Sequence, residues 1–256
     1  MKYLFDCWKE IEKKISQKKV FLLLDYDGTL APIVKNPEKV KHSKEMGVLL
    51  KEISRKLPFA IISGRSLEKI KELVGIENVF YAGNHGLEVE GIQKKFIHPT
   101  ALRIAPSLRK IYKDLKKIRI KGIFVEDKKL TISFHYRAVP KGKIALAKKK
   151  FEKIVKPRLK KGLRIEEGRK RLDVKPDVDW NKGKAVKLIL KIYDRKKILP
   201  ICLGDDKTDE DAFLALKRGI TIWIKSREIK VRGAKYYLKN ISEVKEFLNQ
   251  LNKIIE

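Results

Sequence analysis

The stretch VFLLLDYDGTLAPI, residues 20–33, places two aspartates directly after an apolar run. Residues 20–24 are short and wholly apolar, which predicts a strand buried on both faces, as in a parallel sheet. Asp25 and Asp27 follow with one residue between them, and Gly28 allows a sharp turn. Two carboxylates this close repel each other, so their pKa values split or a cation binds. The stretch predicts a chemically active strand end, although such an aspartate can also cap a turn or helix.

Strands and helices alternate in the rest of the first and last thirds of the chain. Apolar runs predict further strands at residues 58–64, 79–83, 198–204 and 220–224. Helical spacing of apolar residues predicts helices at the N-terminus and at residues 43–57, 66–74, 181–194, 208–217 and 242–255. This alternation predicts an α/β fold with a parallel sheet covered by helices on both faces.

The middle of the chain has a different pattern. Residues 122–137 and 162–176 each contain two strand-like runs around a turn, and helices are expected near residues 100–118 and 141–156. Two hairpins and two helices predict a small α+β domain with a largely antiparallel sheet. We expect it to occupy residues 86–175, inserted into a core domain formed by residues 1–85 and 176–256.

The bulk composition excludes several classes of protein. The chain has 256 residues, 43% of them hydrophobic, which is enough for a substantial core. It has no apolar stretch of membrane-spanning length, and acidic residues interrupt the apolar N-terminus, unlike a signal peptide. Cys7 and Cys202 are the only cysteines, so we expect no disulfide framework, no zinc site and a cytoplasmic location.

The formal net charge of +30 is unusually high. The lysines are spread along the chain, which favours a solvated surface that attracts anionic substrates over a site for polyanions. Basic residues are rarely interleaved with aromatic ones, so a nucleic-acid partner is not expected. The same features give no indication of a membrane partner.

Three other predicted strand or helix ends carry polar groups. The sequence IISGRS ends a strand with Ser63 and Gly64, and NKGKA places Lys182 at the start of a helix. The sequence LGDDKTDEDAF ends another strand and carries five acids: Asp205, Asp206, Asp209, Glu210 and Asp211. Helix capping explains only part of so much negative charge in a basic chain. A hard cation such as Mg²⁺ explains the cluster better.

These four motifs, in this order, resemble those of the haloacid dehalogenase superfamily of phosphatases. The sequences LDYDGTLAPI, ISGR, GNHGLE (83–88), HYR (135–137) and LGDDKTDEDAF resemble, more narrowly, the trehalose-6-phosphate phosphatases. The resemblance implies a Rossmann-like parallel-sheet core with an inserted α+β cap. It also implies Mg²⁺-dependent hydrolysis of trehalose 6-phosphate to trehalose and phosphate through an aspartyl-phosphate intermediate.

The resemblance further implies a role for each motif residue. Asp25 would be the nucleophile, and Asp27 the general acid and then the general base. Phosphate would be bound by Thr29, Ser63, Gly64 and Lys182. Mg²⁺ would be held by Asp25, Asp27 and Asp205, with help from Asp206 and Asp209. Sugar hydroxyls would meet Asn84, His85, Glu126, Lys128, Asp173 and Lys175, although Asp173 stands where the family usually has glutamate.

Other functions remain open at this point. Another phosphatase of the superfamily, acting on a sucrose, mannosyl-glycerate or hexose phosphate, would share the core motifs and differ in the cap. A phosphatase of nucleic-acid ends would use the high positive charge, and a catalytically silent binding module would need none of the intact acids. A trehalose-phosphate synthase of the same pathway is a possible protein partner.

Overall fold

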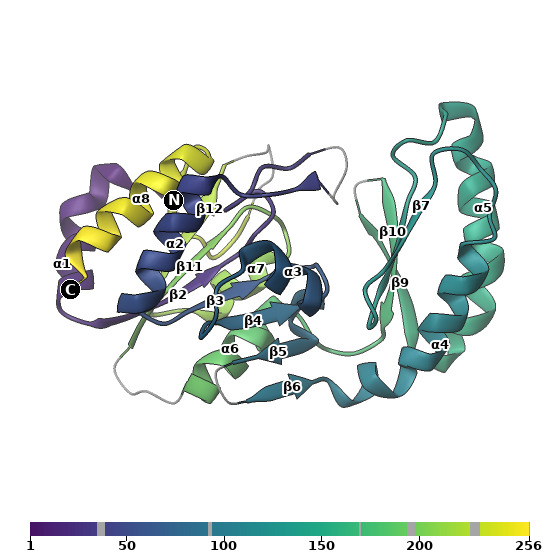
Figure 1. Cartoon of the computed structure of the whole chain (residues 1–256), viewed down its shortest axis with the longest axis horizontal. Helices are drawn as coiled ribbons and strands as arrows, with labels where there is room; N and C mark the ends of the chain where they lie inside the picture. The colour runs from purple at the N-terminus through teal and green to yellow at the C-terminus, as the bar shows by residue number, and fades with distance from the viewer. Residues whose placement is uncertain (35–38, 92–93, 169, 194–197, 226–230, 256) are drawn as a thin grey trace. The chain divides into compact units, whose positions relative to one another are not determined.

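The computed structural model describes residues 1–34, 39–91, 94–168, 170–193, 198–225 and 231–255 (Figure 1). The chain forms two compact units, which we describe separately. The first comprises residues 1–96 and 180–256, and the second comprises residues 97–179. The inserted unit was expected at residues 86–175, and this division places it at residues 97–179.

A nine-stranded, mostly parallel sheet forms the centre of the first unit. Its order is β1-β13-β12-β11-β2-β3-β4-β5-β6. In chain order the strands are β1 (Lys2–Tyr3), β2 (Lys19–Leu24), β3 (Phe59–Ile62), β4 (Phe80–Gly83), β5 (Glu88–Glu90), β6 (Lys95–Ile97), β11 (Ile198–Gly204), β12 (Ile220–Ile224) and β13 (Tyr236–Leu238). β5 runs antiparallel to β4 and keeps the chain in this sheet, which is why the unit extends past residue 86.

The position of β2 explains where a ligand can bind. β2 pairs in parallel with β3 on one side and with β11 on the other. From β2 the chain first builds the sheet toward β4, and later returns through β11 and builds it the other way. In open parallel sheets this reversal leaves a crevice beyond the carboxyl ends of the two strands where it occurs. Asp25 and Asp205 directly follow those two strands.

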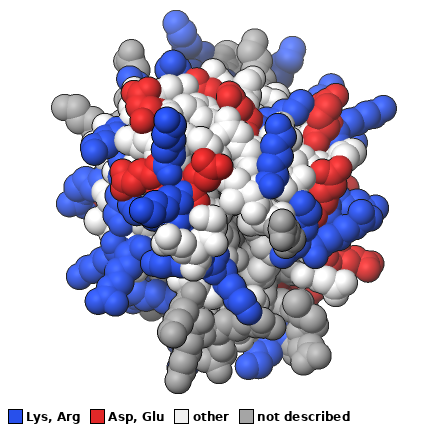
Figure 2. Space-filling model, turned by 90° about the vertical axis from the view of Figure 1, so that its left-hand side faces the viewer, with Lys and Arg blue, Asp and Glu red and all other residues white. Residues whose placement is uncertain are grey.

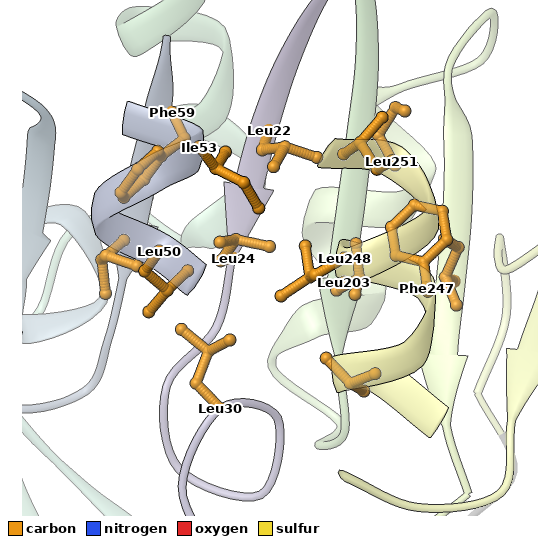
Figure 3. Close-up of a cluster of buried hydrophobic side chains, with 14 of the residues drawn as sticks. Leu22, Leu24, Leu30, Leu50, Ile53, Phe59, Leu203, Phe247, Leu248 and Leu251 are labelled. Carbon is orange, nitrogen blue, oxygen red and sulfur yellow. The ribbon is translucent and has the colours of Figure 1, made fainter. Parts of the chain in front are cut away.

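Helices cover both faces of this sheet. They are α1 (Trp8–Ser16), α2 (Lys44–Lys56), α3 (Leu67–Val74), α6 (Lys182–Tyr193), α7 (Asp209–Ala215) and α8 (Ile241–Ile254). One apolar cluster joins α1, α2, α3 and α8 to side chains such as Leu22 and Leu24 of β2 (Figure 3). A second cluster joins α6 and α7 to the alternate residues Phe21 and Leu23. Successive side chains of β2 point to opposite faces of the sheet, so this strand contributes to the apolar cluster on each face.

The second unit is a four-stranded antiparallel sheet with helices on one face. Its strands, in the order β7-β8-β10-β9, are β7 (Phe124–Asp127), β8 (Ile132–His135), β9 (Leu163–Gly168) and β10 (Arg171–Pro176). Its helices are α4 (Pro99–Leu115) and α5 (Ile144–Val155), and both pack on one apolar cluster with alternate strand residues. Both predicted hairpins and both predicted helices are present in this unit.

Short elements account for most differences from the predicted pattern. The N-terminal segment forms β1 and a 3₁₀ turn before α1, instead of one continuous helix.

No helix in the described part of the chain is both long and apolar enough to cross a membrane. Cys7 and Cys202 are both free thiols.

Candidate active site

Three buried carboxylates converge at the carboxyl ends of β2 and β11. Asp25 follows β2, Asp205 follows β11, and Asp209 is the first residue of α7. Each can offer one carboxylate oxygen to a common point, and these oxygens lie within 4.8 Å of one another. The side chains are almost fully buried, with Asp25 the most exposed at 7%. Asp206, also expected near a metal, is half-buried and is not part of this group.

Lys182, the first residue of α6, lies within this acidic group. Its Nζ donates hydrogen bonds to Oδ1 of Asp25 at 2.6 Å and to Oδ1 of Asp209 at 2.7 Å. Burial alone would lower the pKa of Lys182, but the carboxylates of Asp209 and Asp25 outweigh burial and raise this pKa. The charged ammonium form of Lys182 is therefore favoured, and it links α6 to the other two elements.

The charge balance of this group favours a bound cation. Burial raises the pKa of Asp25 well above its usual value; Lys182 lowers it, while Asp209 and Asp205 raise it further. Three buried carboxylates face one buried ammonium, which leaves excess negative charge in a poorly hydrated place. A divalent cation that prefers oxygen ligands would neutralise this charge and keep Asp25 ionised. The donor set thus fits Mg²⁺.

The backbone around Gly28 packs directly against one of these acids. Gly28 has a φ of +94°, and a Cβ built there would lie 2.1 Å from Oδ2 of Asp205. Both the backbone conformation and the space require glycine at this position. The turn that follows Asp27 is closed by hydrogen bonds from the Leu30 and Ala31 N–H groups to the Tyr26 carbonyl. This glycine therefore allows the turn after β2 to pack against the Asp205 side chain.

Asp27 has a partner that the sequence analysis did not identify. The guanidinium group of Arg65 donates from Nε to Oδ2 of Asp27 at 2.8 Å and from Nη2 to Oδ1 at 2.6 Å. Arg65 is buried, whereas the side chain of Asp27 is 35% exposed. The bidentate pair fixes the orientation of the Asp27 carboxylate. The sequence analysis assigned no role to Arg65, because its burial and its partner could not be read from the motif SGR.

The residues expected to bind phosphate lie on the same edge of the sheet. Thr29 is fully buried, and its Oγ1 makes no hydrogen bond to any of the residues that the structure describes. Ser63 is 1% exposed and its Oγ accepts a hydrogen bond from the Arg65 N–H. A Cβ on Gly64 would lie 2.6 Å from the His85 ring, so only glycine lets the ring approach this closely.

The loop that carries Asn84 and His85 is held in an unusual conformation. Both residues have positive φ values, 51° and 56°, in the 3₁₀ turn η3 (Asn84–Gly86). The Asn84 side chain is 1% exposed and donates to Oε1 of Glu88 at 2.7 Å. The same oxygen accepts a bond from the Leu67 N–H at the start of α3. Asn84 and the unpredicted residue Glu88 thus anchor this loop to α3.

The four residues expected to bind sugar in the second unit share one region of its sheet. Glu126 and Asp173 lie in register with Ser133 of β8, on the face opposite α4 and α5. Ser133 donates to Asp173 at 2.5 Å, and Arg171 donates to the other Asp173 oxygen at 2.8 Å. Lys128 Nζ lies 3.8 Å from Glu126, and Lys175 pairs with Glu166. The structure thus brings these residues together within one unit.

Comparison with known proteins identifies the family. A family model described as trehalose-phosphatase matches residues 23–242. Probable trehalose-phosphate phosphatase G of Arabidopsis thaliana is 38% identical over 95% of this chain and 71% of its own length. Trehalose-phosphate phosphatase B of the same plant is 34% identical over 94% and 68%, and trehalose 6-phosphate phosphatase RA3 of Zea mays is 33% identical over 91% and 70%.

Solved structures agree with the fold. A trehalose-6-phosphate phosphatase related protein superposes with a TM-score of 0.80 at 23% identity, covering 91% of this chain and 97% of the other. The C-terminal domain of the C. albicans trehalose-6-phosphate phosphatase gives a TM-score of 0.76 at 22% identity, covering 96% and 97%. A haloacid dehalogenase-like hydrolase from Bacteroides thetaiotaomicron gives 0.63 at 14% identity, covering 91% and 100%. The chain therefore belongs to the trehalose-phosphatase family, on a haloacid dehalogenase-type fold, and is a phosphoric monoester hydrolase.

Proposed function

We propose that this protein hydrolyses trehalose 6-phosphate to trehalose and phosphate through an aspartyl-phosphate, with Mg²⁺ as cofactor. The main support is the buried group of Asp25, Asp205 and Asp209 around Lys182, in a member of the trehalose-phosphatase family. A carboxylate held at a fixed place beside a cationic group is suited to nucleophilic attack on a phosphate ester.

The proposed reaction has two steps. An oxygen of Asp25 attacks phosphorus, the bond from phosphorus to the sugar oxygen breaks, and Asp27 gives its proton to that oxygen. A water oxygen then attacks the same phosphorus and Asp27 takes a proton from this water. The bond from phosphorus to the Asp25 oxygen breaks, which releases phosphate and regenerates the Asp25 carboxylate. Lys182 fixes Oδ1 of Asp25 at 2.6 Å and so limits the rotation of the nucleophile. Arg65 orients the Asp27 carboxylate in the same way through two hydrogen bonds, and Asp27 must give up one of them when it carries the proton.

Asp25 and Asp205, with the backbone carbonyl of Asp27, are the ligands that we assign to Mg²⁺. When bound, the cation would supply positive charge that screens the approach of a carboxylate to a phosphate dianion. Asp209 is best placed to support this site, because its Oδ2 accepts the N–H groups of Asp205 and Asp206 at 3.1 and 3.0 Å. Thr29, Ser63, Gly64 and Lys182 are the proposed contacts of the phosphoryl oxygens.

We assign recognition of the sugar to the polar sheet face of residues 97–179. This face carries four charged side chains, and buried or half-buried partners restrain them. They are Glu126, Lys128, Asp173 and Lys175. Hydrogen-bonding groups satisfied only by the correct sugar discriminate strongly against other sugars. Asp173 has one methylene less than the glutamate of the family pattern, and its two partners hold it on the sheet.

The test is phosphate release from a panel of sugar phosphates, with Mg²⁺ and with a chelator. We expect trehalose 6-phosphate to be hydrolysed far better than glucose 6-phosphate, and the chelator to abolish turnover until Mg²⁺ is restored. If the enzyme preferred a sucrose, mannosyl-glycerate or hexose phosphate, its assignment as a phosphatase would stand, but trehalose 6-phosphate would be the wrong substrate. If a chelator did not affect turnover, the proposal that Mg²⁺ is the cofactor would be wrong.

A pair of variants separates recognition of the sugar from chemistry. Glu126→Gln or Lys128→Met should lower kcat/KM for trehalose 6-phosphate by about 5- to 150-fold, the effect of losing about 1–3 kcal/mol from one charged hydrogen bond. Turnover of para-nitrophenyl phosphate, which has no sugar, should change little. Equal losses on both substrates would mean that these residues are structural.

A cytoplasmic location and a trehalose-phosphate synthase partner stay predictions.

A further inference from the structure

We propose that Phe124 and His135 form an aromatic platform on the second unit that stacks against one pyranose ring of the substrate. The inference rests on the proposed function, because it assumes a disaccharide phosphate. It adds Phe124, which lies outside the motifs that suggested the family, as a determinant of specificity beside His135 of the motif HYR. The Phe124–His135 platform, as we call it, lies on the polar face of the sheet formed by β7, β8, β10 and β9.

The register of the strands creates this platform. Phe124 lies opposite His135, and Glu126 lies opposite Ser133, two residues further along the same pair of strands. The intervening residue Val125 faces the other way and belongs to the apolar cluster beneath α4 and α5. The period of two therefore places Phe124 on the same face as Glu126 and Asp173.

Phe124 remains exposed, although burying a phenylalanine ring is favourable. Its exposed fraction is 37%, and it lies outside the apolar cluster of this unit. Its ring packs on the His135 ring with centroids 5.5 Å apart and planes at 34°. His135 in turn bonds through Nε2 to Oε2 of Glu126 at 3.0 Å. The platform is thus held in place, and a hydrogen bond joins it to Glu126, which is proposed to bind the sugar.

A pyranose ring needs this combination of groups. Its equatorial hydroxyls lie around the rim and require hydrogen-bonding partners, whereas its C–H groups form an apolar face. An exposed ring with Glu126 and Asp173 in the next row of the same sheet face, and with Lys128 paired to Glu126, offers an apolar contact together with charged hydrogen-bonding groups in one region. Ligand sites commonly combine an aromatic surface with a few polar groups that fix orientation.

The test compares three variants by steady-state kinetics. Phe124→Leu keeps an apolar side chain but removes the ring, and it should raise KM for trehalose 6-phosphate about five- to tenfold, as expected from losing one aromatic contact. Its kcat should stay within about twofold, because the reacting groups lie elsewhere. Phe124→Tyr keeps the ring and should behave like the wild type. Kinetics with para-nitrophenyl phosphate should be unchanged in both variants.

Leu102→Ala is the matched control, because Leu102 is an apolar residue on α4 that is 58% exposed in the same unit. It should leave both substrates unaffected. An unchanged KM in Phe124→Leu would overturn the platform, and so would a parallel loss on both substrates. A wild type that does not prefer trehalose 6-phosphate would instead reject the proposed function and this inference with it. The two failures are therefore distinguishable.

Discussion

At the scale of single residues, the site depends on charges that are costly to bury alone. Lys182 is stable in the core because two carboxylates accept its hydrogen bonds, and Asp209 also caps the N–H groups of the adjacent turn. Removing one partner of such a group leaves an uncompensated buried charge, which typically costs about 3–5 kcal/mol. Lys182 and Asp209 are therefore poor choices for testing chemistry, because their loss would also destabilise the fold.

Asp25 allows a cleaner test. Asp25→Asn should keep the fold, because the amide oxygen can still accept the bond from Lys182 and one negative charge leaves a crowded acidic group. Phosphatase activity should fall at least about a thousandfold, since an amide is a poor nucleophile toward phosphorus. Thermal unfolding and phosphate release check the two halves of this expectation. The exposed Asp6→Asn is the control, and substantial activity in Asp25→Asn would contradict the mechanism.

Some of these residue contacts could be predicted from the sequence and others could not. Asp25 and Asp205 directly follow two strands of a parallel sheet, whose carboxyl ends converge, so the pattern indicated that they share one edge. The role of Lys182 came from the resemblance to the family and not from its position at a helix start. The bond between Arg65 and Asp27 depends on side-chain conformation and burial. The anchoring of Asn84 depends on positive φ values. Neither property has a periodic signal in the sequence.

At the scale of elements, long and apolar segments were predictable, and short edge strands were not. β11 was predicted at residues 198–204 and lies there, because a run of seven residues without a charged side chain is a clear signal for a buried strand. β1, β5, β6 and β13 have only two or three residues each. Such segments become strands because a neighbouring strand offers hydrogen bonds, which is tertiary information. The strands β5 and β6, which were not predicted, also explain why the first unit continues past residue 86.

One element, α7, is tied to a neighbouring loop by a buried acid. Glu210 is 3% exposed and accepts hydrogen bonds from the N–H and the Nε of Arg232, at 2.9 and 2.7 Å. Lys207 also donates to it at 2.6 Å. The bond from Lys207 outweighs burial, and together with Arg232 it lowers the pKa of Glu210 from 4.5 to about 2. The ionised glutamate therefore stabilises the fold.

The stabilisation by Glu210 should depend on pH. A pKa depressed by folding contributes stability that is complete above pH 4.5 and is lost as the pH falls toward 2. Because Arg232 and Lys207 are largely exposed, we expect Glu210→Gln to lower the free energy of unfolding at pH 7 by only about 1–2 kcal/mol. Near pH 2 the difference from the wild type should shrink, as measured by urea unfolding. Glu10→Gln, in an exposed pair, should have little effect, and a pH-independent loss at Glu210 would contradict this account.

At the scale of the whole molecule, the positive charge is unevenly divided. Residues 97–179 contain 26 Lys and Arg against 9 Asp and Glu, whereas the rest of the chain contains 36 against 23. On the face shown in Figure 2, basic side chains are spread among acidic ones without forming a single block. In the second unit, α5 carries exposed lysines at positions 149, 150 and 153. A field of this sign raises the local concentration of anionic substrates and also attracts polyanions without specificity.

The charge therefore gives a prediction that separates attraction from recognition. Binding of labelled duplex or single-stranded nucleic acid should be weak, with Kd of about 10⁻⁵ M near physiological salt, and should fall steeply between 50 and 200 mM salt, as for contacts to phosphates alone. Fluorescence anisotropy with two unrelated sequences measures this, and both should bind alike. Replacing Lys149, Lys150 and Lys153 together by glutamine should weaken binding and reduce the salt dependence. It should not alter turnover of para-nitrophenyl phosphate at high salt, where screening removes any steering of the substrate. Nanomolar binding selective for one sequence or structure at physiological salt would instead require a dedicated nucleic-acid site, and would reopen the reading of this protein as a phosphatase of nucleic-acid ends.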